Sequence, residues 1–190
     1  MLNLEDYIYI DKNCLSKDFC NELLNELKTN KDWQTHRYFD EYNKKVVINE
    51  NEPLVCELST KNNKLLQDKL WFVIQDYLNQ EVIKNSIHPL TSWNGYEAIR
   101  FNCYSEKTEM RYHVDHIQTM FPGEKRGIPT LSIVGLLNDD FEGGEFEFFG
   151  NKKIDLSAGS VVVFPSIFLY PHAVYPVLSG KRYSFVSWVW

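Results

Sequence analysis

The chain reads GGEFEFFGNKKI over residues 143–154, and this short stretch decides the fold class. Two runs of alternating apolar and polar side chains, residues 145–149 and 152–156, flank the turn pair Gly150-Asn151. Such alternation, interrupted by glycine and asparagine, is typical of short strands joined by tight turns. The stretch therefore predicts two strands rather than a helix.

The same pattern extends from about residue 96 to the carboxyl end. Runs rich in Val, Ile, Phe, Tyr and Trp alternate with turn residues at intervals typical of a sandwich or barrel. About eight short strands preceded by two helices predict a mainly β, α+β fold, a double-sheet jelly roll whose helices buttress one sheet. The other expected strands cover residues 96–104, 110–117, 130–137, 160–164, 172–177 and 181–189.

A short strand over residues 6–11 and two helices are expected in the amino-terminal half. Ser16 can cap the first helix, whose apolar residues recur at helical spacing, and the second helix spans roughly 60–79. Residues 30–58 show weak periodicity and are expected to form irregular strands and a loop. This segment is a candidate for a flap that faces the substrate.

Length and composition fit a single domain. The 190 residues are 44% hydrophobic and 24% charged, which is ordinary globular usage and indicates neither disorder nor a fibrous repeat. We expect one domain over residues 1–190, with a helical and flap region at 1–95 and a jelly-roll core at 96–190. A formal net charge of −6 gives no general attraction to nucleic-acid phosphates or anionic lipid, so neither is an expected partner.

The cysteines and the amino terminus bear on the compartment. Cys14, Cys20, Cys56 and Cys103 have no CxxC spacing, which argues against a zinc knuckle and against a secreted disulfide framework. Acids occupy the first residues, where a signal peptide needs positive charge, and no apolar run approaches the ~20 residues that span a membrane. A reducing, cytoplasmic environment is the expectation.

Three side chains suggest a metal site. His113 and Asp115 are two residues apart, so on a strand they share a face, although a His-x-Asp pair alone also describes a solvated strand face. His172 begins an expected hairpin that turns at 179–180. Two imidazoles and one carboxylate can bind one face of iron(II) and leave half of its octahedron open.

Arg182 suggests a binding site beside the metal. It begins an apolar, aromatic run that looks like a core strand, and a buried guanidinium needs a partner, either a carboxylate of this chain or a ligand. The expected hairpin returns Arg182 alongside the sheet that carries His172. Ser184, two residues on and on the same face, can add a hydroxyl donor.

The pattern of His113, Asp115, His172 and Arg182 resembles the iron(II) and 2-oxoglutarate dependent oxygenases, particularly their prolyl 4-hydroxylase-like branch. Three further stretches carry the resemblance: LSIVGLLND before the Gly-Gly-Glu turn, the GGEFEF turn itself, and HAVYPV followed by GKRYS. The specific part of this resemblance spans about residues 97–190.

The resemblance implies a double-stranded β-helix in which His113, Asp115 and His172 are the catalytic iron ligands. It also implies that iron(II), 2-oxoglutarate and molecular oxygen support the hydroxylation of a C–H bond, with succinate and carbon dioxide as co-products, and it leaves room for ascorbate. The implied substrate is a prolyl residue of a peptide or protein, or a small amino-acid-like molecule.

The cosubstrate pocket that the resemblance implies contains one departure. Arg182 would hold the distal carboxylate of 2-oxoglutarate, with Ser184 as a weaker assistant. Many relatives carry a tyrosine three residues before the first histidine, where this chain has Met110. Tyr104 or Tyr112 would then supply the hydroxyl to the pocket.

Two other functions remain open at this point. Two histidines and a carboxylate also suit catalytic zinc, which would make the protein a zinc-dependent hydrolase. A buried arginine ten residues after a ligand argues against hydrolysis, which has no evident use for it. The second alternative is a non-catalytic jelly-roll binding module with a sugar or peptide groove.

Five further side chains receive structural interpretations. His116 would point away from Asp115, toward the surface or behind the metal ligands. Arg100 is expected to serve structure rather than substrate, Glu147 to lie on the wet face of its strand, and Trp188 and Trp190 to fill the core between the sheet and the helices.

Overall fold

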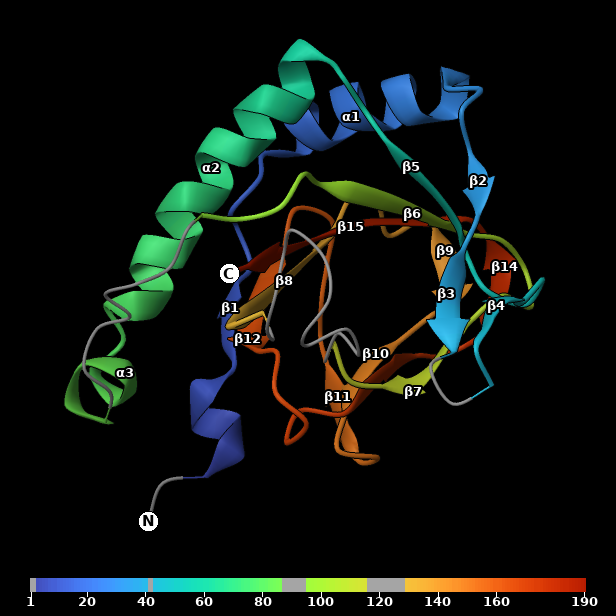
Figure 1. Cartoon of the computed structure of the whole chain (residues 1–190). Helices are drawn as coiled ribbons and strands as arrows, with labels where there is room; N and C mark the ends of the chain where they lie inside the picture. The colour runs from blue at the N-terminus through green and yellow to red at the C-terminus, as the bar shows by residue number, and fades with distance from the viewer. Residues whose placement is uncertain (1–2, 41–42, 87–94, 116–128) are drawn as a thin grey trace.

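The structure, a computed structural model, describes residues 3–40, 43–86, 95–115 and 129–190 (Figure 1). His116 therefore lies outside the described residues, as does the end of the expected strand 110–117. The helices are η1 (Leu4–Tyr7), α1 (Lys17–Thr29), α2 (Lys61–Leu78) and α3 (Glu81–Ser86). The strands are β1 (Tyr9–Asp11), β2 (Gln34–Thr35), β3 (Arg37–Asp40), β4 (Lys45–Ile48), β5 (Leu54–Glu57), β6 (Arg100–Tyr104), β7 (Met110–His113), β8 (Leu131–Leu136), β9 (Phe141–Gly143), β10 (Phe146–Phe148), β11 (Lys152–Ile154), β12 (Val161–Pro165), β13 (His172–Val174), β14 (Val177–Gly180) and β15 (Arg182–Val189).

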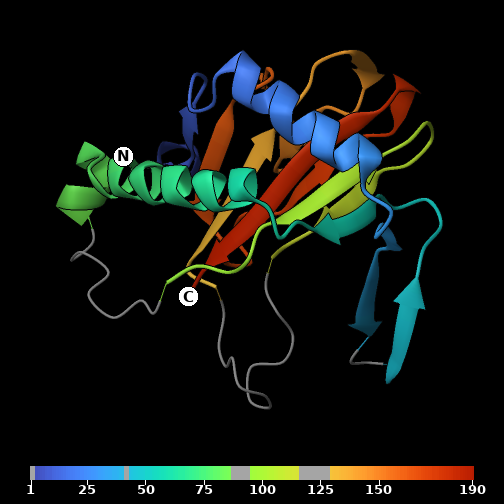
Figure 2. The same cartoon turned by 90° about the horizontal axis from the view of Figure 1, so that it is seen from above.

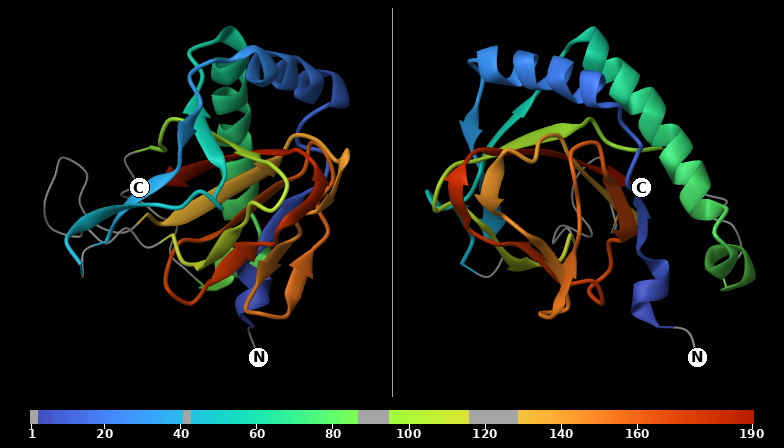
Figure 3. Two further views of the ribbon diagram at one scale, coloured as in Figure 1. Left: turned by 90° about the vertical axis from the view of Figure 1, so that its right-hand side faces the viewer. Right: turned by 180° about the vertical axis from the view of Figure 1, so that it is seen from behind.

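Two antiparallel sheets face each other and form the predicted jelly roll. The larger sheet has the strand order β1-β12-β8-β15-β6-β5-β2, and the smaller has the order β11-β10-β13-β7. Seen from behind, the strands form a ring, with α1 and α2 lying outside it (Figure 3). Both helices cover the outer face of the larger sheet (Figure 2). The mainly β fold with two buttressing helices is thus confirmed.

The larger sheet is buried on both faces, and alternation along β15 shows how. Phe185 and Val189 belong to the core cluster beneath the helices, whereas Val186 and Trp188 pack in the cluster between the two sheets. Successive side chains of a strand point to opposite faces, so residues of this apolar run alternate between the helix side and the space between the sheets. The prediction that Trp188 packs toward the helices is therefore wrong.

The two helices begin where their capping residues predict. The Ser16 hydroxyl accepts a hydrogen bond from the Phe19 N–H at 3.3 Å, and the Thr60 hydroxyl accepts one from the Asn63 N–H at 3.2 Å. Each cap satisfies a backbone donor that has no partner inside the helix. The buried stripes that face the sheet are Phe19, Cys20, Leu23, Leu24 and Leu27 of α1, and Leu66, Leu70, Val73, Ile74 and Tyr77 of α2.

The carboxy-terminal strands pair differently from the expected hairpin. The run expected to continue to residue 177 stops at Val174, and β14 pairs with β9 in a separate two-stranded sheet. As a result β13 lies in the smaller sheet and β15 in the larger one. His172 and Arg182 consequently belong to opposite sheets, and the prediction that they share one sheet is wrong.

The segment over residues 30–58 forms short strands at one side of the molecule. β2 and β5 extend the larger sheet, while β3 and β4 pair only with each other. The β3–β4 hairpin projects away from the body of the fold (Figure 2). Within the described residues, no helix is both long and apolar enough to cross a membrane.

Replacement of Gly135 by alanine should destabilise the fold. Gly135 is the cross-strand neighbour of Phe185, and an added Cβ would lie 2.1 Å from the Phe185 Cζ atom. Because that ring is fully buried, the clash should lower the free energy of unfolding by about 1–3 kcal/mol, measured by urea denaturation. Combining the change with Phe185→Leu should cost less than the sum of the two single changes. Strict additivity would contradict the close approach of this ring.

Candidate active site

His113, Asp115 and His172 come together at the inner edge of the smaller sheet. β7 and β13 are antiparallel, and His113 is the direct cross-strand partner of His172. β7 ends at His113, so Asp115 follows the strand rather than lying on it. Its Oδ1 atom is nevertheless 3.4 Å from His113 Nε2 and 3.7 Å from His172 Nε2. One ligand atom from each of the three residues lies within 4.8 Å of the others, so the group can hold a metal ion.

Both imidazoles are oriented by their own strands. His113 Nδ1 lies 2.7 Å from the Arg111 carbonyl oxygen, and His172 Nδ1 lies 3.0 Å from the Tyr170 carbonyl oxygen. A carbonyl oxygen only accepts, so each Nδ1 must carry the proton and donate it. Each Nε2 atom faces Asp115 and is the ring nitrogen left for a metal, which is the arrangement that metal-binding histidines use.

The surroundings of His172 and Asp115 hold these two groups in the protonation states that a metal needs. The His172 ring lies among Phe146, Phe148 and Phe164, with ring centroids 4.9 to 5.7 Å away, and burial lowers its pKa to about 4. Burial opposes ionisation of Asp115, but the neighbouring imidazoles outweigh it and hold its pKa well below the usual range. Near neutral pH the site therefore presents neutral His172 and a carboxylate.

The Asp115 carboxylate also supplies a direct test of whether a metal fits. Its Oδ2 atom is buried and has no hydrogen-bond partner within the described part of the chain. An unpartnered buried carboxylate oxygen is costly, and a cation bound beside it removes the cost. With two imidazole Nε2 atoms adjacent, the donor set is the 2-His-1-carboxylate set typical of non-haem iron(II). The residues present therefore fit iron(II).

Arg182 faces this metal group from the opposite sheet. It is only 1% exposed, and it lines the same cavity as His113, Asp115 and His172. Its Nη1 donates to Ser184 Oγ at 2.9 Å, and its Cζ lies 5.0 Å from the centre of the Tyr104 ring. No carboxylate of the described residues forms an ion pair with it, and its Nε has no partner there. The guanidinium is thus buried, oriented and available to an anion.

Asn138 fixes the strand at the position of Arg182. Its Oδ1 accepts the Tyr183 N–H at 2.7 Å, and its Nδ2 donates to the Lys181 carbonyl at 2.7 Å. The two contacts hold the backbone on either side of Arg182. Gly144 leaves room for the side chain itself, since an added Cβ there would lie 2.9 Å from Arg182 Cδ.

The remaining residues expected in the cosubstrate pocket divide into two groups. Ser184, Tyr104 and Met110 line the cavity. Tyr112 does not: it is exposed, and its hydroxyl contacts the Gly150 N–H and the Glu147 carboxylate outside the cavity. Of the two tyrosines considered as replacements for the missing family tyrosine, the structure therefore places only Tyr104 beside Arg182.

Glu147 corrects the prediction of a wet strand face. It is 4% exposed, because Tyr175 donates to its Oε1 at 3.0 Å and Tyr112 lies over it at 3.5 Å. Sequence alternation placed it opposite Phe146 and Phe148, and this is correct. The local sequence pattern could not predict that two tyrosines, one from β7 and one from the turn after β13, would cover the Glu147 side chain.

Three further residues with hydrogen-bonding side chains, none of them predicted to belong to the site, also line the cavity. They are Arg100 and Asn102 of β6 and Trp188 of β15. No ion pair joins Arg100 to an acid of the described residues, and its Nε lacks a hydrogen-bond partner there. Strand alternation could have identified these three residues. Positions 100 and 102 share a strand face with Tyr104, and position 188 shares one with Arg182 and Ser184.

The carboxy-terminal half matches a known protein family. Residues 99–190 fit the family model described as the 2OG-Fe(II) oxygenase superfamily. The chain is similar to a PKHD-type hydroxylase of Alteromonas mediterranea, at 34% identity over 95 residues that cover 47% of this chain and 41% of that protein. It is also similar to one of Synechococcus sp., at 40% identity over 83 residues that cover 41% and 34%. The chain thus spans less than half the length of these curated relatives.

Solved structures extend the likeness in fold to nearly the whole chain. A viral collagen prolyl hydroxylase from Paramecium Bursaria Chlorella virus-1, in its 2OG complex, superposes with a TM-score of 0.67 at 18% identity, covering 96% of this chain and 94% of that one. A Trichoplax adhaerens prolyl hydroxylase bound to a peptide fragment gives 0.70 at 17% identity, covering 97% and 84%. The resemblance seen in the sequence is confirmed: residues 99–190 carry the sequence pattern of the 2OG-Fe(II) oxygenase superfamily, on a prolyl hydroxylase-like jelly roll.

Proposed function

We propose that this protein is an iron(II)- and 2-oxoglutarate-dependent dioxygenase that hydroxylates a C–H bond and releases succinate and carbon dioxide. The observation that carries the proposal is Arg182, a buried guanidinium without a carboxylate partner among the described residues, in the same cavity as the His113, Asp115 and His172 group. A metal group alone does not indicate a dicarboxylate cosubstrate. An oriented guanidinium that faces the metal group does indicate one, because a guanidinium binds a carboxylate through two parallel hydrogen bonds.

The residues divide the work between metal and cosubstrate. His113, Asp115 and His172 hold iron(II), which when bound supplies the oxygen chemistry of the reaction. Arg182 binds the distal carboxylate of 2-oxoglutarate, with Ser184 fixing one nitrogen of the guanidinium. Tyr104 packs against the guanidinium and occupies the place of the missing family tyrosine. The aromatic wall around His172 keeps water from the reacting centre.

The substrate in this proposal is a prolyl residue of a peptide or protein, or a small amino-acid-like molecule. Support comes from the two similar solved structures, which are both named prolyl hydroxylases. One of them is bound to a peptide fragment. The curated relatives are hydroxylases by name. The β3–β4 hairpin projects beside the sheets and provides the candidate flap over a bound substrate (Figure 2).

We further propose that residues 1–190 act as one domain. Side chains of α1 and α2 share a single core cluster with the helix-facing side chains of β6, β8, β12 and β15. A buried apolar interface of this kind couples the two regions into one folding unit. The fold match over 96% of the chain supports the same conclusion.

One experiment separates this function from zinc hydrolysis and from simple binding. Addition of iron(II) and 2-oxoglutarate without oxygen should produce a metal-to-ligand charge-transfer absorption, because the cosubstrate chelates the iron. Admission of air should then release succinate. The zinc-loaded protein serves as the control and should show neither signal. Folded, iron-loaded protein that gives no absorption and no succinate would exclude the oxygenase function.

A further inference from the structure

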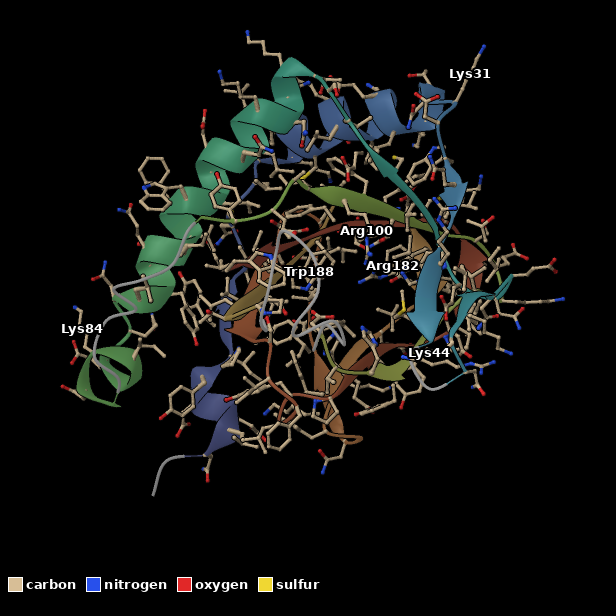
Figure 4. The ribbon with its side chains drawn as sticks, viewed as in Figure 1. Lys31, Lys44, Lys84, Arg100, Arg182 and Trp188 are labelled. Atoms are coloured by element: carbon tan, nitrogen blue, oxygen red, sulfur yellow. The ribbon has the colours of Figure 1, made fainter. Side chains whose placement is uncertain are left out.

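A second arginine, the half-buried Arg100, lines the cavity that holds the metal group. β6 and β15 are antiparallel neighbours with Arg100 opposite Val186, Asn102 opposite Ser184 and Tyr104 opposite Arg182. Alternation places residues 100, 102 and 104 on one face of β6, and all three line the cavity. In Figure 4 the labelled Arg100, Arg182 and Trp188 side chains lie together in the space between the two sheets.

Arg100 has one buried donor, its Nε, that no described residue accepts. Its Nε atom is buried without a hydrogen-bond partner, and its guanidinium stacks on Trp188 with Cζ 4.9 Å from the ring. Glu52, a buried carboxylate whose charge acts on Arg100, is instead paired with His36 at 2.6 Å. Stacking fixes the orientation of a guanidinium but uses none of its N–H groups. A buried guanidinium N–H without an acceptor is a position that a ligand anion can satisfy.

The indole of Trp188 also has a donor without a hydrogen-bond partner. Its Nε1 atom is also buried and has no hydrogen-bond partner among the described residues. An indole N–H can only donate, and buried donors are nearly always satisfied. Arg100 and Trp188 therefore present two unsatisfied donors in stacking contact with each other. A carboxylate, with two oxygens that only accept, satisfies both.

This pair of donors is separate from the cosubstrate site. Arg100 lies opposite Val186, four residues along β15 from Arg182, which at the rise of an antiparallel strand is roughly 13 Å between the Cα positions. With their backbone positions this far apart along the sheet, the two arginines enter the cavity at different places.

We propose that Arg100, assisted by the Trp188 N–H, binds a carboxylate of the substrate, so that the carbon to be oxidised lies a few bonds from an acidic group. The inference rests on the proposed oxygenase function and narrows its substrate class. It favours a free amino acid, a peptide carboxyl terminus or an acidic side chain over a neutral internal residue. Trp188 contributes one donor and the stacking surface that orients Arg100.

The test uses matched acid and amide pairs with the full-length protein. Parent protein is loaded with iron(II) and 2-oxoglutarate and given L-proline or L-prolinamide, N-acetyl-L-proline or its amide, and N-acetyl-L-aspartate or its amide. Two responses are measured: a change in the iron and 2-oxoglutarate absorption without oxygen, and succinate formation above the substrate-free rate in air. The parent should respond to at least one acid at a concentration about 10- to 100-fold below that for its amide.

Three variants then assign that preference to its residues. Arg100→Gln should remove the preference for the acid while retaining the 2-oxoglutarate affinity. Arg100→Lys, which keeps the charge but not the planar fork, should restore part of it. Trp188→Phe keeps the ring and should lower acid binding by a smaller factor. Lys12→Gln is the control, since Lys12 is an exposed cation that contacts Asp155 and does not line the cavity.

The outcomes separate this inference from the function on which it rests. A parent protein with no charge-transfer absorption overturns the proposed function itself. A parent with that absorption but no acid preference in any pair, including no response to any compound, overturns the carboxylate subsite alone. Retention of the preference in Arg100→Gln does the same. A loss of 2-oxoglutarate affinity in Arg100→Gln would instead assign Arg100 to the cosubstrate.

Discussion

Replacement of Arg182 by alanine is expected to weaken 2-oxoglutarate binding by about 100-fold while the affinity for iron(II) stays unchanged. The Arg182 guanidinium is buried and has no carboxylate partner among the described residues. In the proposed complex, a carboxylate of 2-oxoglutarate would supply its anionic contact. Loss of a charge-assisted, paired hydrogen bond in a dry cavity removes more binding energy than the same loss at a surface. The measurement is a titration of the charge-transfer absorption with 2-oxoglutarate at saturating iron(II).

Lys181→Ala is the matched control for this change. Lys181 is the preceding cation on the chain and is exposed, and its contact with Asn138 uses the backbone carbonyl, which the substitution leaves in place. The control should bind 2-oxoglutarate like the parent. Arg182→Lys should bind with intermediate affinity, because a single ammonium cannot reproduce the two parallel hydrogen bonds. Equal 2-oxoglutarate affinity in Arg182→Ala and parent would refute the role given to this residue.

Replacement of His172 by alanine should abolish iron(II) binding at stoichiometric concentration, and succinate formation with it. His172 supplies one of three ligand atoms, and its Nε2 is held in place by the Nδ1 contact with Tyr170. A site left with one imidazole and one carboxylate has too few ligands to retain a labile divalent iron against dialysis. Metal content after anaerobic dialysis, measured by atomic absorption, gives the result directly.

A carboxylate comparison shows whether that loss is specific to the site. Asp115→Asn removes the charge of a buried ligand, whereas Asp155→Asn removes that of an exposed carboxylate paired with Lys12. The first should lose iron, and the second should retain it with full activity. Circular dichroism should show the same β content in all variants, since substitution of one metal-ligand residue leaves the strand pairing within both sheets in place. Iron retained by folded His172→Ala would place the metal elsewhere.

The secondary structure could be predicted where local signals are strong. Ser16 and the helical spacing after it identified α1, and alternation bounded by glycine identified most strands of the second half. The short β9 and β14 and the six-residue α3 were missed. Elements this short contain too few residues to establish a period, and their pairing supplies most of their stability.

Pairing between distant strands could not be predicted. The segment from His172 to Val189 looked like one hairpin, because Ser179-Gly180 is a good turn signal. In the structure β14 turns aside to pair with β9, and β13 and β15 enter different sheets. Strand partners depend on contacts that are remote in sequence, so a turn signal fixes where a chain bends but not which sheet it joins.

The two faces of the larger sheet raised a related difficulty. Trp188 was predicted to lie on the helix side, and a structural role was favoured for Arg100. Alternation correctly groups residues of β15 into two sets, but both sets are largely apolar because both faces are buried. Nothing in the local pattern says which set faces the helices. That choice decided whether Trp188 and Arg100 belong to the core or to the cavity.

By itself, the sequence indicated the candidate ligand residues, the arginine beside them and the alternation that gives each strand two faces. The tertiary structure alone decided that Arg182 faces the metal group from the opposite sheet, and that Arg100 shares their cavity. The reason is physical. Residue type and period are local properties of a chain, whereas a cavity exists only after two sheets pack together and bury charged groups whose partners must then come from a ligand.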